Sequence, residues 1–119
     1  MDFNEYQQAA YKTAMNPTLD HLAFGLLEEA GEIAGILKRF HRGDDDYIET
    51  YNADNPELIT VPSFLAYDKL ESEIGDCLWY LAALCEFLSV DLEDIAKQNI
   101  EKLKDRQERG VIRGSGDVR

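Results

Sequence analysis

Residues 25–38 read Gly-Leu-Leu-Glu-Glu-Ala-Gly-Glu-Ile-Ala-Gly-Ile-Leu-Lys, and residues 71–76 read Glu-Ser-Glu-Ile-Gly-Asp. Both stretches predict an amphipathic helix, yet both carry carboxylates on or beside the face that should be apolar. At about 100° per residue, a set of apolar side chains falls within roughly 60° of Glu29. That set is Leu22, Leu26, Ile33, Ile36 and Phe40. We therefore expect Glu29 in the middle of the buried stripe, Glu32 at its edge, and Glu28 pointing further outward.

The second stretch belongs to a helix with its own apolar stripe. The stripe consists of Leu70, Ile74, Cys77, Leu81, Leu84 and Leu88. Glu73, Asp76 and Tyr80 run along its margin. Burying a carboxylate is costly unless it is paired or binds a metal. Two helices that each carry carboxylates at a spacing of three residues therefore predict a positive centre between them.

Composition bounds the fold and the partners. The chain has 119 residues with 45% hydrophobic content, enough for one domain (1–119) with one core. Only three Pro and eight Gly, together with long periodic segments, predict an all-α protein. The net charge of −12 argues against a general nucleic-acid or anionic-membrane surface. An anionic ligand would need a cation to mediate its binding.

Four helices are expected, over residues 3–15, from Thr18 or Asp20 to His41, over 63–88, and over 92–109. Their expected caps and breakers are Asp2, Asn16, Pro17, Gly43, Ser63, Asp91 and Gly110. Between Arg42 and Pro62 the helical period is lost. We expect a loop of about twenty residues there, with one extended piece and a loop-like Asn52–Pro56 segment.

Other sequence features indicate a soluble, cytoplasmic protein. Cys77 and Cys85 lie eight residues apart on one predicted helix, too far for a disulfide within it, so both are expected to be reduced. Met1 leads straight into a polar stretch without a signal-peptide pattern. No apolar run approaches the ~20 residues that span a bilayer.

Two explanations of the carboxylates stay open from the residues alone. Ligands that are all oxygen are typical of Mg²⁺ or Mn²⁺, and no His or Cys has zinc spacing. Several carboxylates can hold more than one divalent ion, which suggests a polyphosphate substrate. Alternatively, the carboxylates form a buried ion-pair cluster with Lys38, Lys69 or cations of the last helix.

Several residues are candidates for substrate contact. Asn99, Lys102 and Arg106 on the last helix, with the basic tail, offer donors and positive charge to a phosphate chain, and Lys38 is a further candidate. Lys102 and Arg106 equally fit ordinary surface residues. Three aromatic side chains offer a surface for a base, namely Phe24, Trp79 and Tyr80. Most helical aromatics are core, so stacking is favoured mainly for Tyr80, which shares the carboxylate margin.

The motif Glu28-Glu29-x-x-Glu32 followed by Glu73-x-x-Asp76 resembles the E-E-x-x-E … E-x-x-D signature of the MazG-like, all-α nucleoside triphosphate pyrophosphohydrolases. The resemblance extends to Phe3–Gln7, to Tyr80 and to the segment from Asn99 to Asp117. It covers most of the chain except residues 43–66. The paired motif is fairly specific for the superfamily and weak for the substrate.

The resemblance implies a four-helix bundle with a loop insertion between helices two and three, completed by dimerisation into a homodimer or homotetramer. It implies Mg²⁺-dependent hydrolysis of a nucleoside triphosphate between the α and β phosphates, in house-cleaning or nucleotide-pool control. Carried over by position, the metal ligands are Glu29, Glu32, Glu73 and Asp76. The catalytic residues are Glu28, which orients the attacking water, and Glu29.

Three alternatives stay open. A dUTPase-like or a phosphoribosyl-ATP-specific enzyme belongs to the same superfamily. A non-catalytic helical module that binds metal and serves in oligomeric assembly belongs to a different class. The separation between Glu32 and Glu73 is longer than in compact members, so the 43–66 insertion is expected to cover the site or alter base selection.

Overall fold

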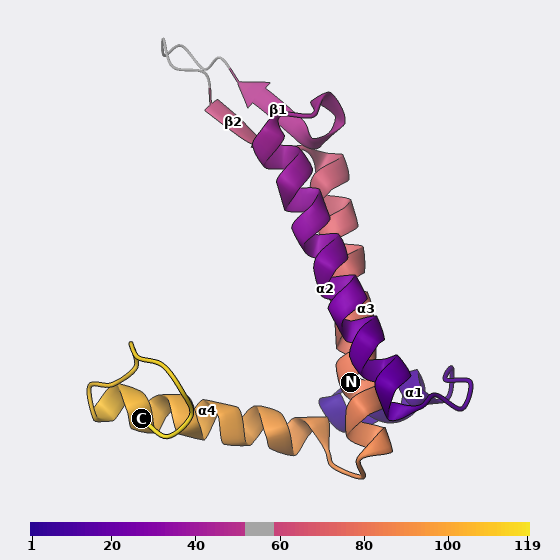
Figure 1. Cartoon of the computed structure of the whole chain (residues 1–119), viewed down its shortest axis with the longest axis vertical. Coiled ribbons are helices and arrows are strands. Elements are labelled where there is room, and N and C mark those ends of the chain that lie inside the picture. The colour runs from indigo at the N-terminus through magenta and orange to yellow at the C-terminus, as the bar shows by residue number, and fades with distance from the viewer. Residues whose placement is uncertain (52–58) are drawn as a thin grey trace. The chain divides into compact units, whose positions relative to one another are not determined.

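The computed structural model describes residues 1–51 and 59–119, and helices dominate it (Figure 1). In chain order the elements are α1 (Phe3–Tyr11), α2 (Leu19–Arg42), a short 3-10 helix η1 (Asp45–Tyr47), β1 (Ile48–Tyr51), β2 (Ile59–Pro62), α3 (Phe64–Phe87) and α4 (Leu92–Glu108). The prediction of an all-α, four-helix fold is confirmed. The expected Asn52–Pro56 loop lies outside the described residues.

The helix ends follow the capping chemistry of the sequence. The Thr18 hydroxyl accepts the His21 N–H, which satisfies a free donor at the start of α2. Gly43 ends α2 in the left-handed region at φ 80°, where a residue without Cβ is favoured. The Ser63 hydroxyl accepts the Ala66 N–H at 3.1 Å and caps α3. The first helix ends at Tyr11, four residues earlier than expected.

The chain forms two compact units, whose boundary falls within α3 after Leu81. We call residues 15–81 the carboxylate unit, and residues 1–14 with 82–119 the tail unit. A single domain over 1–119 stays a prediction.

In the carboxylate unit, α2 and α3 run antiparallel, because Gly25 lies against Tyr80 while Glu29 lies beside Glu73. Leu22 is fully buried. The insertion is a two-stranded antiparallel hairpin in which Ile48 pairs with Pro62 and Tyr51 with Ile59, so it holds two extended pieces instead of one. The Ser63 hydroxyl donates to the Asp46 carbonyl, which ties η1 to the residue that caps α3.

In the tail unit, a buried glutamine joins α1 to the start of α4. The Gln7 side-chain amide donates to the Val90 carbonyl and to Glu86, and its oxygen accepts the Leu92 N–H at 2.7 Å. This amide therefore satisfies backbone groups that the α3–α4 turn leaves open. Cys85 of this unit is a buried free thiol, and Cys77 of the carboxylate unit is a free thiol as well.

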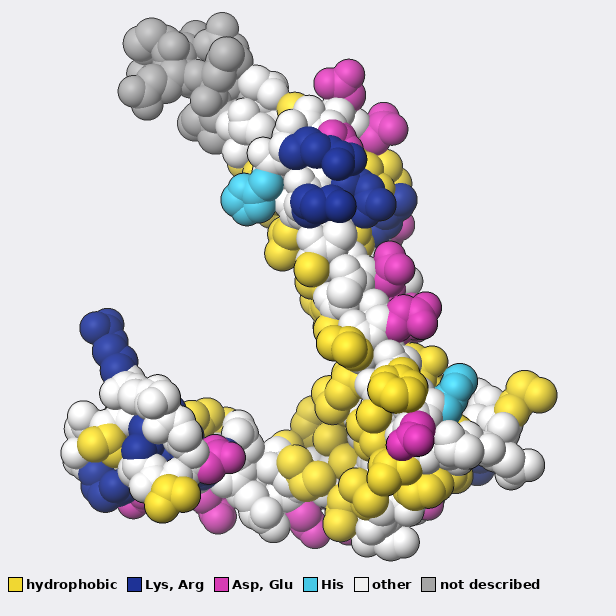
Figure 2. Space-filling model, in the orientation of Figure 1, with side chains coloured by type: hydrophobic (Ala, Val, Ile, Leu, Met, Phe, Trp, Pro, Cys, Tyr) yellow, Lys and Arg dark blue, Asp and Glu magenta, His cyan; other side chains and the backbone are white. Residues whose placement is uncertain are grey.

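Large apolar side chains stay exposed on the carboxylate unit (Figure 2). Phe24, Leu27 and Phe64 are each at least 70% exposed. Ile74 and Leu81, predicted in the buried stripe of α3, are 57% and 41% exposed, so that part of the prediction is wrong. The reason is geometric, since a helix with one helical neighbour buries one face. No helix within the described ranges is long and apolar enough to cross a membrane.

Candidate metal centre

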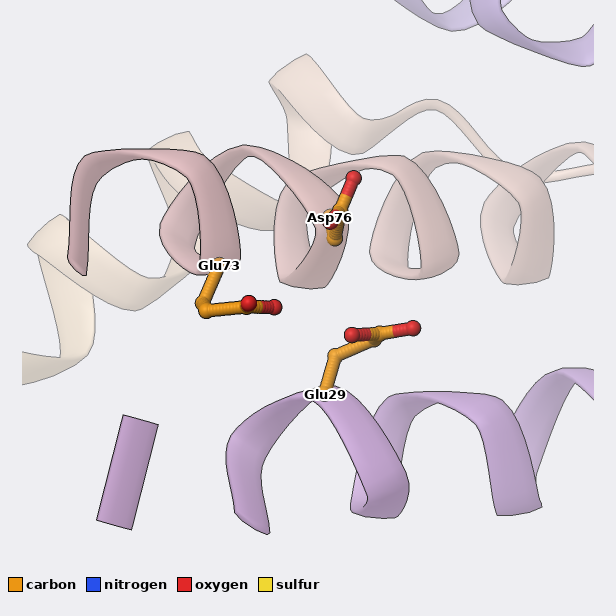
Figure 3. Close-up of side chains that lie close together, drawn as sticks. All are labelled: Glu29, Glu73 and Asp76. Atoms are coloured by element: carbon orange, nitrogen blue, oxygen red, sulfur yellow. The ribbon is translucent and has the colours of Figure 1, made fainter. Parts of the chain in front are cut away.

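Three carboxylates from α2 and α3 converge in the carboxylate unit. Glu29, Glu73 and Asp76 each offer one oxygen, and these oxygens all lie within 4.8 Å of one another. Figure 3 shows Glu29 reaching from α2 toward α3, with the Glu73 carboxylate opposite it. The three-residue spacing on α3 places Glu73 and Asp76 one turn apart on the same face. The sequence periodicity therefore predicted this convergence correctly for three of the four proposed ligands.

The cluster holds more negative charge than the fold favours. Burial raises the pKa of Glu29, and the hydrogen bond with Glu73 and the charges of Asp76, Glu73 and Glu28 raise it further. Every group that shifts it is acidic, so among the described residues Lys and Arg do not compensate it. The alternative of a buried ion-pair cluster is therefore not supported. Burial and the same carboxylates also raise the pKa of Cys77.

This donor set fits a hard divalent cation. The ligand atoms are all oxygen, which such cations prefer. Glu29 and Glu73 are half-buried and Asp76 is exposed, so the centre opens to solvent on one side. Glu32 is exposed and lies outside the group of three, and Glu28 is exposed as well. A ligand role for Glu32 and a catalytic role for Glu28 stay predictions.

Aromatic side chains flank the carboxylates on α3. An open pocket of roughly 340 Å³ is lined by Glu29, Asp76, Trp79 and Tyr80, within the usual size of a small-molecule site, about 300–1,000 Å³. The Trp79 and Tyr80 rings meet edge to face at 4.9 Å. Phe24, the third aromatic candidate, is 70% exposed and does not line this pocket. The pocket therefore joins two carboxylates to two aromatic rings.

The cations of the carboxylate unit gather at the hairpin end of α2 and α3 (Figure 2). They are Lys38, Arg39, Arg42 and Lys69. Nine residues separate Lys38 from Glu29, roughly 13.5 Å along the helix axis. Arg42 pairs with Asp44 at 2.7 Å. A substrate contact for Lys38 stays a prediction.

The other proposed substrate residues belong to the tail unit. Asn99 and Lys102 are exposed, whereas Arg106 is only 4% exposed, so it is not an ordinary surface residue. The Arg106 guanidinium donates to the carbonyls of Gly116 and Asp117 and to the Asp117 carboxylate. Sequence reasoning missed Asp117 as a partner, although it is the single acid in a basic, Gly-rich tail. Substrate contacts by Asn99, Lys102 and Arg106 stay predictions.

The helical pair and its open acidic centre place this chain among α-helical proteins with a candidate divalent-cation site. The sequence model of the MazG nucleotide pyrophosphohydrolase domain matches residues 18–111, and the chain belongs to this family. The match includes α2, α3 and α4 and therefore every residue proposed for the site.

Two relatives are similar over most of their length. The "Gene 37 protein" of Mycobacterium phage L5 is 37% identical over 128 aligned positions that span the whole of both chains. The "Uncharacterized protein YvdC" of Bacillus subtilis (strain 168) is 33% identical over 85 positions, 70% of each chain. No solved structure matches the chain.

Proposed function

We propose that this protein is a Mg²⁺-dependent nucleoside triphosphate pyrophosphohydrolase. Its substrate is a (d)NTP, and its products are the (d)NMP and pyrophosphate. The observation that carries the proposal is the convergence of Glu29, Glu73 and Asp76 without a compensating Lys or Arg among the described residues. Family membership supports the same reaction class.

The chemistry suits this arrangement. A divalent cation at the centre, Mg²⁺ with Mn²⁺ as a substitute, would neutralise the triphosphate and the leaving pyrophosphate. Glu29, Glu73 and Asp76 would hold it, with Glu32 as a fourth ligand. The oxygen of the attacking water bonds to the α phosphorus, and its proton passes to the solvent. The bond from that phosphorus to the bridging oxygen breaks, and this oxygen leaves with pyrophosphate. Glu28 orients this water. Tyr80 offers a surface to the base, and Lys38, Asn99 and Lys102 offer charge and donors to the substrate.

We further propose that the protein works as a homodimer or homotetramer. On α3, Tyr67, Ile74 and Leu81 recur every seven residues and are all exposed, at 53%, 57% and 41%. A stripe with this period is typical of a helix that packs on another helix. A second copy of the chain is the partner that would cover it. Light scattering should give a mass of two or four chains, and a monomer at micromolar concentration would reject this proposal.

The decisive test of the activity is pyrophosphate release from a panel of canonical and modified nucleoside triphosphates, with Mg²⁺ and with EDTA. Glu73→Gln should lower kcat/KM at least about 100-fold, because the centre loses the negative charge of one carboxylate ligand. The matched control is Glu71→Gln, which removes an exposed carboxylate two residues away and should retain activity. The absence of hydrolysis of every nucleotide by the wild type would reject the proposed function.

A further inference from the structure

Gly25 of α2 lies directly against the ring of Tyr80. A Cβ atom at position 25 would stand 2.1 Å from Tyr80 Cε1, 2.3 Å from Cζ and 2.7 Å from the hydroxyl oxygen. Carbon atoms in contact are normally about 3.5–4.0 Å apart. Gly25 is buried. The missing side chain is therefore what lets the outer edge of the Tyr80 ring rest on the α2 backbone.

The other glycines of α2 show that this contact is particular to Gly25. A Cβ at Gly31 would meet nothing within 4 Å, and one at Gly35 would meet only the flexible tip of Arg39 at 3.1 Å. Gly25 does not have a positive φ, so its backbone conformation does not require glycine. Glycine is unfavourable inside a helix. The reason for glycine at this position is therefore the room that it leaves for Tyr80.

Tyr80 in this position forms one wall of the pocket beside the candidate metal centre. It lines that pocket with Glu29, Asp76 and Trp79. Two further rings lie beside it: the centroid of the Trp79 ring is 4.9 Å away in an edge-to-face arrangement, and that of the His21 ring is 6.5 Å away. A side chain at position 25 would displace Tyr80 from α2 and change the shape of the pocket, while the three carboxylates keep their own helices and spacing.

We propose that Gly25 is a positioning residue, which sets the position of Tyr80 and thereby the shape of the nucleobase site. This inference rests on the proposed function, because it assumes that the phosphates of the substrate lie at the carboxylates and its base lies at the aromatic rings. A planar base stacks on an aromatic ring, and the strength of stacking depends on how the two faces meet. Displacement of Tyr80 therefore weakens binding of the base and leaves binding of the phosphates intact.

The test compares Gly25→Ala with the matched control Gly31→Ala. Trp79 is the single tryptophan of the chain and lines the pocket, so its fluorescence reports nucleotide binding without any need for hydrolysis. Gly25→Ala should weaken binding of a nucleoside triphosphate at least about tenfold. The affinities for Mn²⁺ and for inorganic pyrophosphate should stay within about twofold, since neither ligand has a base. Gly31→Ala should bind like the wild type.

A double mutant distinguishes an effect of Gly25→Ala through Tyr80 from a general disturbance of the fold. In a Tyr80→Ala background, Gly25→Ala should have no further effect, because the ring that it displaces is gone. If Gly25→Ala alone does not fold, the double mutant should fold. Three outcomes would overturn the inference. Gly25→Ala could bind the nucleotide with wild-type affinity, its effect could persist without the Tyr80 ring, or the double mutant could also fail to fold. If fluorescence shows that the wild type binds the nucleotide but the assay shows no hydrolysis, the proposed enzyme activity is rejected. The role of Gly25 in positioning Tyr80 is then still tested by the binding data.

Discussion

Two groups of carboxylates in this protein have opposite electrostatic surroundings. In the carboxylate unit, Glu29 lies among Glu73, Asp76 and Glu28, and its pKa is raised. In the tail unit, Asp117 accepts from Lys102 and Arg106, both at 3.3 Å, and these two cations lower its pKa. Among the described residues, the same chemical group therefore has compensating cations at one place and none at the other.

A carboxylate that the fold itself balances can thus be distinguished from one that is a candidate cation ligand. The charge of Asp117 is matched by cations of its own helix and tail, so the fold itself accounts for it. The charge at Glu29 is not matched by the described residues, so either protonation or a cation from solution has to balance it.

The largest effect is expected for cation binding. Asp76→Asn should weaken Mn²⁺ binding by at least about tenfold. Mutation of residues that only hydrogen-bond to metal ligands already weakens metal binding by about 10–100-fold. Asp117→Asn is the matched control, since it removes the same charge from a carboxylate already paired, and it should leave Mn²⁺ affinity unchanged. Calorimetric titration measures both. Equal losses in the two variants would mean that Mn²⁺ responds only to the overall charge of the protein.

A smaller effect is expected for folding stability in the tail unit. Arg106→Gln should lower the free energy of unfolding by roughly 1–3 kcal/mol, because the buried guanidinium holds the tail through hydrogen bonds to a carboxylate and two carbonyls. Denaturant unfolding measures the change, and hydrogen exchange should show faster exchange of the tail amides. Arg113→Gln, at an exposed position of the same tail, should change stability by less than about 0.5 kcal/mol. Equal losses in both variants would contradict the role of Arg106.

Local signals predicted most of the helical frame and the centre of the site. Thr18 and Gly43 mark the ends of α2 because capping depends on neighbouring backbone groups. Helical period placed Glu73 and Asp76 on one face of α3, and both converge with Glu29 in the structure, although the apolar stripe predicted for α3 was wrong at Ile74 and Leu81.

What the sequence did not predict depends on contacts between distant residues. The hairpin strands are four residues each, too short for a periodic signal, and their pairing is set by the fold. The partner of Arg106 lies eleven residues away in a tail without helical period. The contact between Gly25 and Tyr80 spans two helices, so nothing in the neighbourhood of either residue indicates it.

The smallest effect is expected on the melting temperature of the cation-free protein, when the charge of Glu29 is removed. Glu29→Gln should raise the melting temperature near pH 7.5 by about 2–5 °C. A raised pKa means that the charged form of Glu29 is unfavourable in the fold, so stability is lost as the pH rises through that pKa. The advantage of Glu29→Gln should therefore disappear as the pH falls below the ordinary Glu value of 4.5.

Asp117→Asn should do the opposite. A lowered pKa means that the charged form of Asp117 stabilises the fold above its ordinary value of 3.8, and that this contribution is lost as the pH falls through the lowered pKa. The melting temperature of Asp117→Asn should therefore lie below that of the wild type at neutral pH, and the deficit should persist at pH 4.5, where the effect of Glu29→Gln has faded. Melting curves of both variants between pH 3 and pH 8, recorded with EDTA, measure this. A fall in melting temperature for Glu29→Gln at neutral pH would mean that its carboxylate is compensated after all, and the contrast between the two groups would fail.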